Sequence, residues 1–266
     1  MNLKEAIYLI TAIICLESAF YAVYLNRKAL TNIVYTMLTA DFAIISFILY
    51  KISGAGSYSS CMWWYNANTI PGCLVPSLSL HLSLCITENK ISRYPCVLPI
   101  LYIPAFIFVY LMSYEGFFRS ECHLTDWGWE TVINFNTKYA YIFILYANLS
   151  LAASAGIIIH WRYCLSRGFK TIHAKSILLP YLAGIGGMFM CPYFLDIDKN
   201  DFLNMLMDIS GHILFVIFVI GIRYSIYRYS FMKITSMSSV SAIINGLSEP
   251  SFLIGINGNI IHYNRA

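Results

Sequence analysis

The chain has 266 residues, of which 59% are hydrophobic and 11% are charged. Soluble domains carry about 25% charged residues, so this composition excludes an ordinary soluble enzyme or binding protein and indicates a membrane protein. The formal net charge of +4 comes from residues scattered between apolar segments rather than from a basic block with interleaved aromatic residues. The sequence therefore gives no sign of nucleic-acid binding, and its expected partner is the lipid bilayer.

Seven apolar segments follow one another along the chain, each about twenty residues long, which is the length that crosses the hydrocarbon core of a bilayer. The sequence therefore predicts an all-α membrane protein, a bundle of seven transmembrane helices. The third segment is the least regular, because it contains Pro71, Pro76 and many hydroxyl groups, and a re-entrant or interfacial segment is the alternative there. The segments are residues 5–25, 33–53, 64–87, 96–113, 138–161, 176–195 and 203–226.

The lysine and arginine residues predict the orientation of the bundle. Alternate connections, together with the exit from the last segment, hold eleven of them: Arg27, Lys28, Lys90, Arg93, Arg162, Arg167, Lys170, Lys175, Arg223, Arg228 and Lys233. The opposite side holds five: Lys4, Lys51, Arg119, Lys138 and Lys199. By the positive-inside rule, the N-terminus is expected outside and the C-terminus in the cytoplasm, as in a multi-pass protein of the cytoplasmic (inner) membrane.

The C-terminal residues 243–266 have a different pattern, IINGLSEPSFLIGINGNIIHYNRA. They predict a short amphipathic helix, a Glu-Pro break, a strand over Ser251–Ile256, a turn and a second strand. The turn is Asn257–Gly258, and Asn-Gly between two apolar runs is the strongest short-range signal for a β-hairpin.

This C-terminal pattern resembles the start of a PAS domain. Gly258, Ile260, Asn264 and Ala266 match the family pattern, whereas Asn257 stands where the family usually has Asp. A PAS domain needs about a hundred residues to close a core, so residues 243–266 are expected to be the truncated start of one. The expected domains are then a sensor at 1–232, a linker helix at 233–242, and this α+β start.

The membrane segments resemble the N-terminal seven-helix sensor region of bacterial histidine kinases. The resemblance lies in VPSLSLHLSLCITENK (residues 75–90), RYPCVLPILYIPAFIFVYLMSYEG (93–116), HWRYCLSRGFKTIHAKSILLPYLAGIGG (160–187) and GIRYSIYRYSFMKITSMSS (221–239). The matched positions are Pro76, His81, Tyr102, Pro104, Ala174, Tyr227 and Arg228. The resemblance implies a sensor of an unknown small-molecule or ionic signal. The signal would pass through the seventh helix to PAS and an output domain, and the protein would be a homodimer by analogy with the family. The same input also precedes diguanylate cyclases.

No catalytic motif accompanies these segments. The sequence has no phosphoacceptor His followed by Glu and Thr-Pro, no ATP-lid glycines, no P-loop and no GGDEF-like string, so neither catalysis nor a cofactor is expected of this chain. The alternatives are a secondary transporter or channel, although no inverted repeats are evident, an intramembrane enzyme using Glu17, Asp41 or Asp208, and an inert fragment of a disrupted sensor gene.

Ionisable residues inside the predicted spans are the candidate functional residues, because burying such groups in a bilayer is costly. Glu17 and Asp41 fall near mid-membrane on neighbouring segments, where they form a candidate ligand or proton site or a neutral hydrogen-bonding contact. Asp208 and His212 share one helix face, but no third ligand completes a metal site, so no metal is predicted. His81 lies toward the inner end of its segment, as a candidate ligand contact or a packing residue.

The expected outer surface is rich in aromatic residues, with Trp63, Trp64, Trp127 and Trp129 as an interfacial belt or the rim of a pocket. The outer loop at residues 113–137 is long enough to act as a lid. Cys61 and Cys122 both fall in outer loops, so a disulfide between them is a hypothesis.

The last two segments contain the candidate moving parts. Gly184, Gly186 and Gly187, flanked by Pro180 and Pro192, predict either close helix packing or a bend in the sixth segment. Residues 221–245 contain no proline, so the seventh helix is expected to continue toward the PAS start.

Overall fold

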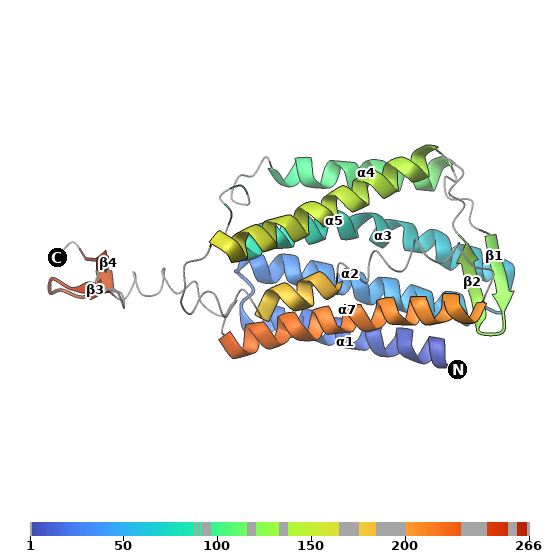
Figure 1. Cartoon of the computed structure of the whole chain (residues 1–266), viewed down its shortest axis with the longest axis horizontal. Coiled ribbons are helices and arrows are strands. Elements are labelled where there is room, and N and C mark those ends of the chain that lie inside the picture. Colours follow the sequence, from blue (N-terminus) through green and yellow to red (C-terminus); the bar gives the residue numbers. More distant parts are fainter. Residues whose placement is uncertain are drawn as a thin grey trace.

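The computed structural model describes residues 2–87, 89, 91, 97–115, 121–132, 138–164, 176–184, 201–229, 244–254 and 260–264. Within them, long antiparallel helices form a bundle, with a β-hairpin at one end (Figure 1). Helix α1 (Leu3–Leu25) packs on α2 (Leu30–Ser53) and α7 (Asp201–Tyr229), α2 packs on α3 (Tyr58–Ile86), and α3 packs on α4 (Val97–Glu115) and α5 (Lys138–Cys164).

Five of these helices contain stretches long and apolar enough to cross a membrane: Leu3–Leu25, Leu30–Ser53, Tyr58–Ile86, Tyr141–Cys164 and Met205–Ser225. The apolar part of α4, Pro99–Met112, is shorter, and the sixth predicted segment is described as helix only over residues 176–184. The protein is thus a multi-pass helical membrane protein. The count of seven spans and their orientation stay predictions.

Side-chain hydrogen bonds fix the start of α1 and the turn between α1 and α2. The Asn2 side chain accepts a bond from the Glu5 amide at 2.8 Å, and the Glu5 carboxylate accepts one from the Asn2 amide at 3.2 Å. This capping box satisfies backbone donors that the first turn of α1 leaves free. At the tight turn into α2, the Asn32 side chain donates to the carbonyl of Ala22 at 3.0 Å. That bond fixes the start of α2 against the end of α1.

Helix α3 is continuous for 29 residues despite Pro71 and Pro76. It starts at an N-cap, where Ser57 accepts a bond from the Ser60 amide at 3.3 Å. Its length and apolar composition favour a membrane span over the re-entrant alternative. Each proline lacks the N–H that would bond the carbonyl four residues earlier, so the carbonyls of Ala67 and Gly72 lose their helical partners.

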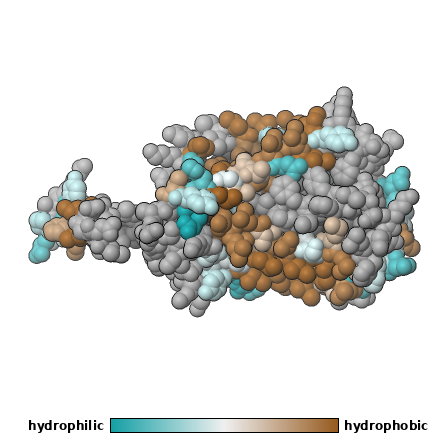
Figure 2. Space-filling model, in the orientation of Figure 1, coloured by the Kyte–Doolittle hydropathy of each residue, from teal (hydrophilic) through white to brown (hydrophobic). Residues whose placement is uncertain are grey.

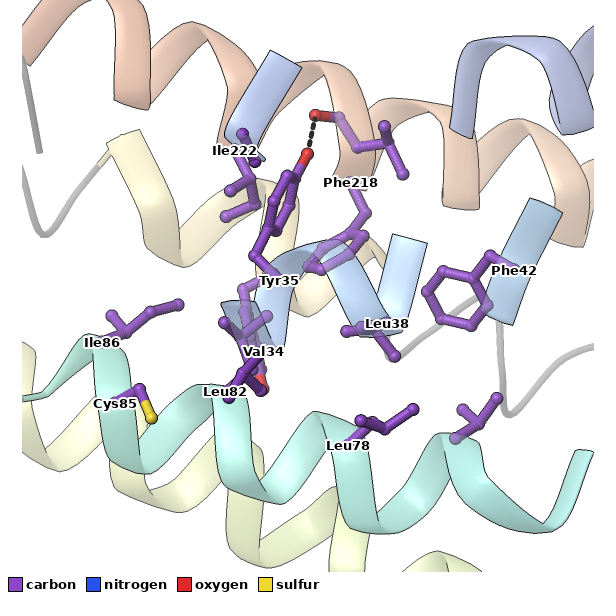
Figure 3. Packing of buried hydrophobic residues seen from close by; sticks show 14 of the residues in the cluster. Val34, Tyr35, Leu38, Phe42, Leu78, Leu82, Cys85, Ile86, Phe218 and Ile222 are labelled. Carbon is purple, nitrogen blue, oxygen red and sulfur yellow. Dashed lines mark hydrogen bonds between the residues drawn. The ribbon is translucent and has the colours of Figure 1, made fainter. Parts of the chain in front are cut away.

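The core lies where α2, α3 and α7 meet, as Figure 3 shows. Val34, Leu38, Leu82 and Phe218 are fully or almost fully buried there. The Tyr35 hydroxyl crosses to α7 and donates to the carbonyl of Val219 at 3.2 Å (dashed in Figure 3). Apolar side chains also cover much of the outside of the helices, and Figure 2 shows hydrophobic residues across the middle of the bundle with hydrophilic ones gathered toward its ends. This distribution suits a bundle surrounded by lipid.

Small residues let the 176–184 helix approach α7 closely. Ser176, Pro180 and Gly184 recur at four-residue spacing and meet Ser225, Gly221 and Phe218 respectively. A Cβ built on Gly184 would lie 2.7 Å from the Phe218 ring, and one built on Gly221 would overlap Pro180. The close packing predicted for Gly184 is therefore present, whereas Gly186, Gly187 and Pro192 lie outside the described residues.

The predicted outer loop contains a β-hairpin, β1 (Glu121–Thr125) paired antiparallel with β2 (Gly128–Val132). In the turn, the Thr125 hydroxyl donates to the carbonyl of Gly128 at 2.8 Å. Gly128 has φ of 106° and its Cα faces the Ser53 carbonyl so closely that any Cβ would collide with it. The sequence predicted a lid at this position but no strands.

The C-terminal hairpin predicted from the sequence is confirmed as β3 (Phe252–Ile254) paired antiparallel with β4 (Ile260–Tyr263). Asn264 holds the start of β3, because its side chain accepts from the Ser251 amide at 2.8 Å and donates to the Glu249 carbonyl at 2.7 Å. The predicted Asn257–Gly258 turn and residues 230–243, through which α7 was expected to continue, lie outside the described residues.

Candidate functional site

The central polar group of the bundle is the carboxylate of Asp41, on the inward face of α2. Its residue is 7% exposed, and its Oδ2 has no hydrogen-bond partner. Cys73 of α3 and Tyr102 of α4 lie within electrostatic range of it. A buried polar atom without a partner costs about 1–3 kcal/mol, more if the group is charged. Asp41 is therefore the described residue that most needs a ligand or a proton.

The neighbouring face of α3 continues the polar interior. Cys73, Ser77 and His81 are spaced four residues apart and so share one helix face. Ser77 donates to the Leu101 carbonyl at 2.7 Å, and His81 Nδ1 lies 3.0 Å from the Tyr102 hydroxyl. His81 is buried, and its Nε2 has no partner.

Several unpaired atoms in this interior are hydrogen-bond acceptors. They include Asp41 Oδ2 and the buried side-chain oxygen of Asn68. In α3, Pro71 and Pro76 donate no backbone bond to the carbonyls of Ala67 and Gly72. The Ser18 and Ser79 hydroxyls and His81 Nε2 are unpaired as well, and these groups can donate. A carboxylate oxygen can only accept, so Asp41 Oδ2 itself favours a proton, a small cation or a ligand that donates hydrogen bonds.

A second polar group in the core surrounds the Ser79 carbonyl, although the Ser79 hydroxyl itself is buried without a partner. The Ser154 and Tyr181 hydroxyls lie 3.0 and 2.7 Å from the Ser79 carbonyl oxygen, so one of them donates to that carbonyl and the other donates either to the same carbonyl or to its neighbouring hydroxyl. The two hydroxyls are 2.5 Å apart. This network joins α3, α5 and the 176–184 helix, and we interpret it as a set of interhelical hydrogen bonds that stabilise the packing of these helices. The sequence did not predict this network, although hydroxyl groups in apolar segments are a visible signal for one.

Glu17 does not join Asp41 in the interior, contrary to the paired site expected from the sequence. Its side chain is 60% exposed on the outside of the bundle and forms an ion pair with Arg223 of α7 at 2.9 Å. Arg223 also lies over the ring of Tyr21, 4.8 Å from its centroid. The sequence predicted Arg223 as an anchor at the exit from the last segment, and it lies within α7.

His212 is buried in α7, with its ring centroid 4.6 Å from that of Tyr8 in α1. The side chain of Asp208 lies outside the described part of the structure, so its pairing with His212 stays a prediction. In the described ranges, no group of three metal-ligating side chains occurs.

The β1–β2 hairpin covers the ends of α1, α2 and α3, as a lid would. Lys4 and Glu130 form an ion pair at 2.6 Å with side chains that are 6% and 18% exposed. The Asn2 side chain donates to the Trp127 carbonyl at 2.7 Å. Trp129 stands 6.3 Å from Tyr58, centroid to centroid.

The four predicted rim tryptophans do not share one environment. Trp64 and Trp129 pack against a small apolar cluster formed by Ile48, Ile52, Cys61 and Cys122. Trp63 is 63% exposed beside Trp64. Cys61 and Cys122, the hypothetical disulfide, are free thiols that contact each other in this cluster.

No protein-family model matches the chain, and comparison with curated proteins also finds no match. The resemblance to histidine-kinase sensor regions therefore rests on the residues described above.

Proposed function

We propose that the chain is the membrane-embedded input module of a sensor histidine kinase or a related signalling protein. The module senses a proton, a small cation or a hydrogen-bond-donating ligand in the interior of the bundle and passes the signal through α7 to the cytoplasmic side. The observation that carries the proposal is the buried Asp41 carboxylate, whose Oδ2 has no partner. A homodimer in the inner membrane, with the N-terminus outside, is part of the same proposal.

An unpaired buried carboxylate is suited to sensing because two arrangements of the bundle can differ in how well they stabilise its charge. A proton or cation at Asp41 removes its net charge and stabilises the arrangement that buries it. Without that ligand, an arrangement that admits water or turns the side chain toward a donor is favoured. A signal shifts such an equilibrium only by binding one arrangement better than the other.

The contacts of α2 connect Asp41 to α7. Phe42, the next residue, packs on Phe215 at 4.5 Å and on Phe218 at 6.3 Å between ring centroids. Tyr35, on the same helix, bonds the Val219 carbonyl. A small rotation of α2 around Asp41 would therefore move the packing surface of α7, since close-packed helices shift as units.

The C-terminal hairpin supports a cytoplasmic signalling connection. Its apolar side chains Phe252, Ile254, Ile260 and Tyr263 are all more than half exposed. Exposed apolar side chains in such a group mark a surface that contacts other protein. The PAS and output domains implied by the resemblance would supply that contact.

Infrared difference spectroscopy of the chain in lipid nanodiscs, between acidic and neutral buffer, tests the sensing site. The wild type should show the carbonyl band of a protonated carboxyl group in an apolar environment, and Asp41→Asn should lose it. Asp126→Asn removes an exposed carboxylate from the β1–β2 turn and should keep the band. Identical spectra for the wild type and Asp41→Asn would contradict the proposal.

A further inference from the structure

Two thiols meet where the hairpin joins the helices. Cys61 lies in the first turn of α3 and is fully buried, and Cys122 in β1 is 6% exposed. Their side chains interact directly within the apolar cluster that also holds Trp64 and Trp129. Strand β1 and helix α3 are far apart in sequence, so this contact depends on the docking of the hairpin.

Independent contacts hold the hairpin in the position that brings the thiols together. The Lys4–Glu130 ion pair fixes β2 to α1, and the Asn2 bond to the Trp127 carbonyl fixes the turn. Because these bonds involve neither cysteine, the thiols are placed by the rest of the fold.

We propose that Cys61 and Cys122 form a disulfide that fastens the hairpin to the end of α3. The end of the bundle that carries the hairpin is the one predicted to face outside, where thiols are oxidised. The inference goes beyond the signal sensed and rests on one part of the proposed function, the orientation that places the hairpin outside.

The oxidation balances as a thiol–disulfide exchange with a dithiol–disulfide oxidoreductase of that compartment. The thiolate of one cysteine attacks the oxidoreductase disulfide, forms a mixed disulfide and releases one oxidoreductase thiolate. The second cysteine, as thiolate, displaces the other sulfur, so the protein ends with one S–S bond and the oxidoreductase with two thiols. The two protons of the cysteines balance the two thiols produced.

The first exchange, with the oxidoreductase, takes place before the hairpin docks, and docking then brings the second cysteine to the mixed disulfide. Burial raises the pKa of the Cys122 thiol, and its contact with Cys61 lowers that pKa by a smaller amount. A docked thiol is thus both shielded and weakly ionised, and the thiolate is the reactive form. Once formed, the bond would keep the hairpin closed over the ends of α1, α2 and α3.

The test is peptide mapping of the full chain purified from membranes, with free thiols alkylated before digestion without reductant. A peptide pair linked through Cys61 and Cys122 is expected, and it should disappear after reduction. Cys61→Ser should abolish the linked pair and leave Cys122 alkylated, whereas the matched control Cys164→Ser, which removes an exposed thiol, should retain it. Alkylation of both cysteines in the unreduced wild type would overturn the proposal, and this measurement needs no variant to fold.

Limited proteolysis supplies a second readout. Reduction should speed cleavage within the hairpin several-fold in the wild type and leave the rate unchanged in Cys61→Ser. An equal effect of reductant on both proteins would show that the bond does not fasten the hairpin.

Discussion

The carboxylate of Glu17 in α1 and the guanidinium of Arg223 in α7 form an ion pair at 2.9 Å on the outside of the bundle. The pair joins α1 to α7, which Figure 1 shows side by side, and Arg223 lies six residues before α7 ends at Tyr229. In a bilayer, each charge reduces the cost of placing the other beside lipid. A motion of α7 relative to α1 would have to keep this pair together or break it.

Reversing the charges of this pair should show that it acts as a unit. Glu17→Arg and Arg223→Glu each place two like charges side by side, so each should lower the thermal unfolding temperature in nanodiscs. The double variant should recover roughly half or more of the loss, as expected for coupled residues. Additive losses in the double variant would show that the pair is incidental.

The small-residue packing between α7 and the 176–184 helix should not tolerate a side chain at Gly221. Gly221→Val would collide with Pro180, and overpacking of this kind costs about 1–3 kcal/mol. Gly156→Val is the matched control, because a Cβ at Gly156 in α5 meets nothing within 4 Å. Chemical denaturation of the reconstituted chain should separate the two variants, and equal stabilities would contradict the packing described here.

The Lys4–Glu130 pair should control the docking of the hairpin. Lys4→Met leaves the Glu130 carboxylate in a largely buried position without its cation, which costs about 3 kcal/mol for a buried pair. Hydrogen exchange in β1 and β2 should therefore become faster. Adding Glu130→Gln removes the unpaired charge and should slow exchange again, whereas equally fast exchange in the double variant would indicate that the charge is not the cause.

Asn264 should be required for an ordered C-terminal hairpin. Asn264→Ala removes bonds to the Ser251 amide and to the Leu247 and Glu249 carbonyls, and the loss of such bonds costs about 1–3 kcal/mol. Amide exchange at Ser251 should become faster. Glu249→Ala keeps the backbone carbonyl that Asn264 uses, so amide exchange in this variant should match that of the wild type. An equal effect of both variants would show that the Asn264 side chain does not order the hairpin.

Local patterns predicted the helices and the C-terminal hairpin. Apolar runs of membrane-spanning length predicted the five helices that are long and apolar enough to cross a bilayer, because this requirement is visible in the composition. The Asn-Gly dipeptide marked β3 and β4 because its turn preference is local. The β1–β2 hairpin was not predicted, since its turn contains Thr-Asp-Trp-Gly and its position depends on Ser53 and Lys4, which are distant in sequence.

The candidate site was predicted residue by residue but not as an arrangement. Asp41 and His81 were identified because charge and imidazole are rare inside spans. Which of their atoms stay unpaired depends on which helix faces contact each other. The same is true of Glu17, which lies on the outer surface in an ion pair with Arg223. A single sequence does not specify those contacts.

The most direct test of the account measures whether α7 responds to Asp41. Spin labels are attached to Cys164 at the end of α5 and to Tyr224→Cys in α7, which are both exposed sites, and report the distance between these helices. Cys96 and Cys191, which lie outside the described residues, are changed to Ser so that they take no label. The account predicts that the distance distribution changes between acidic and neutral buffer in this protein, and that Asp41→Asn holds it in one state. A distribution that is unchanged by pH, or that shifts equally in Asp41→Asn, would contradict a sensor in which Asp41 drives α7.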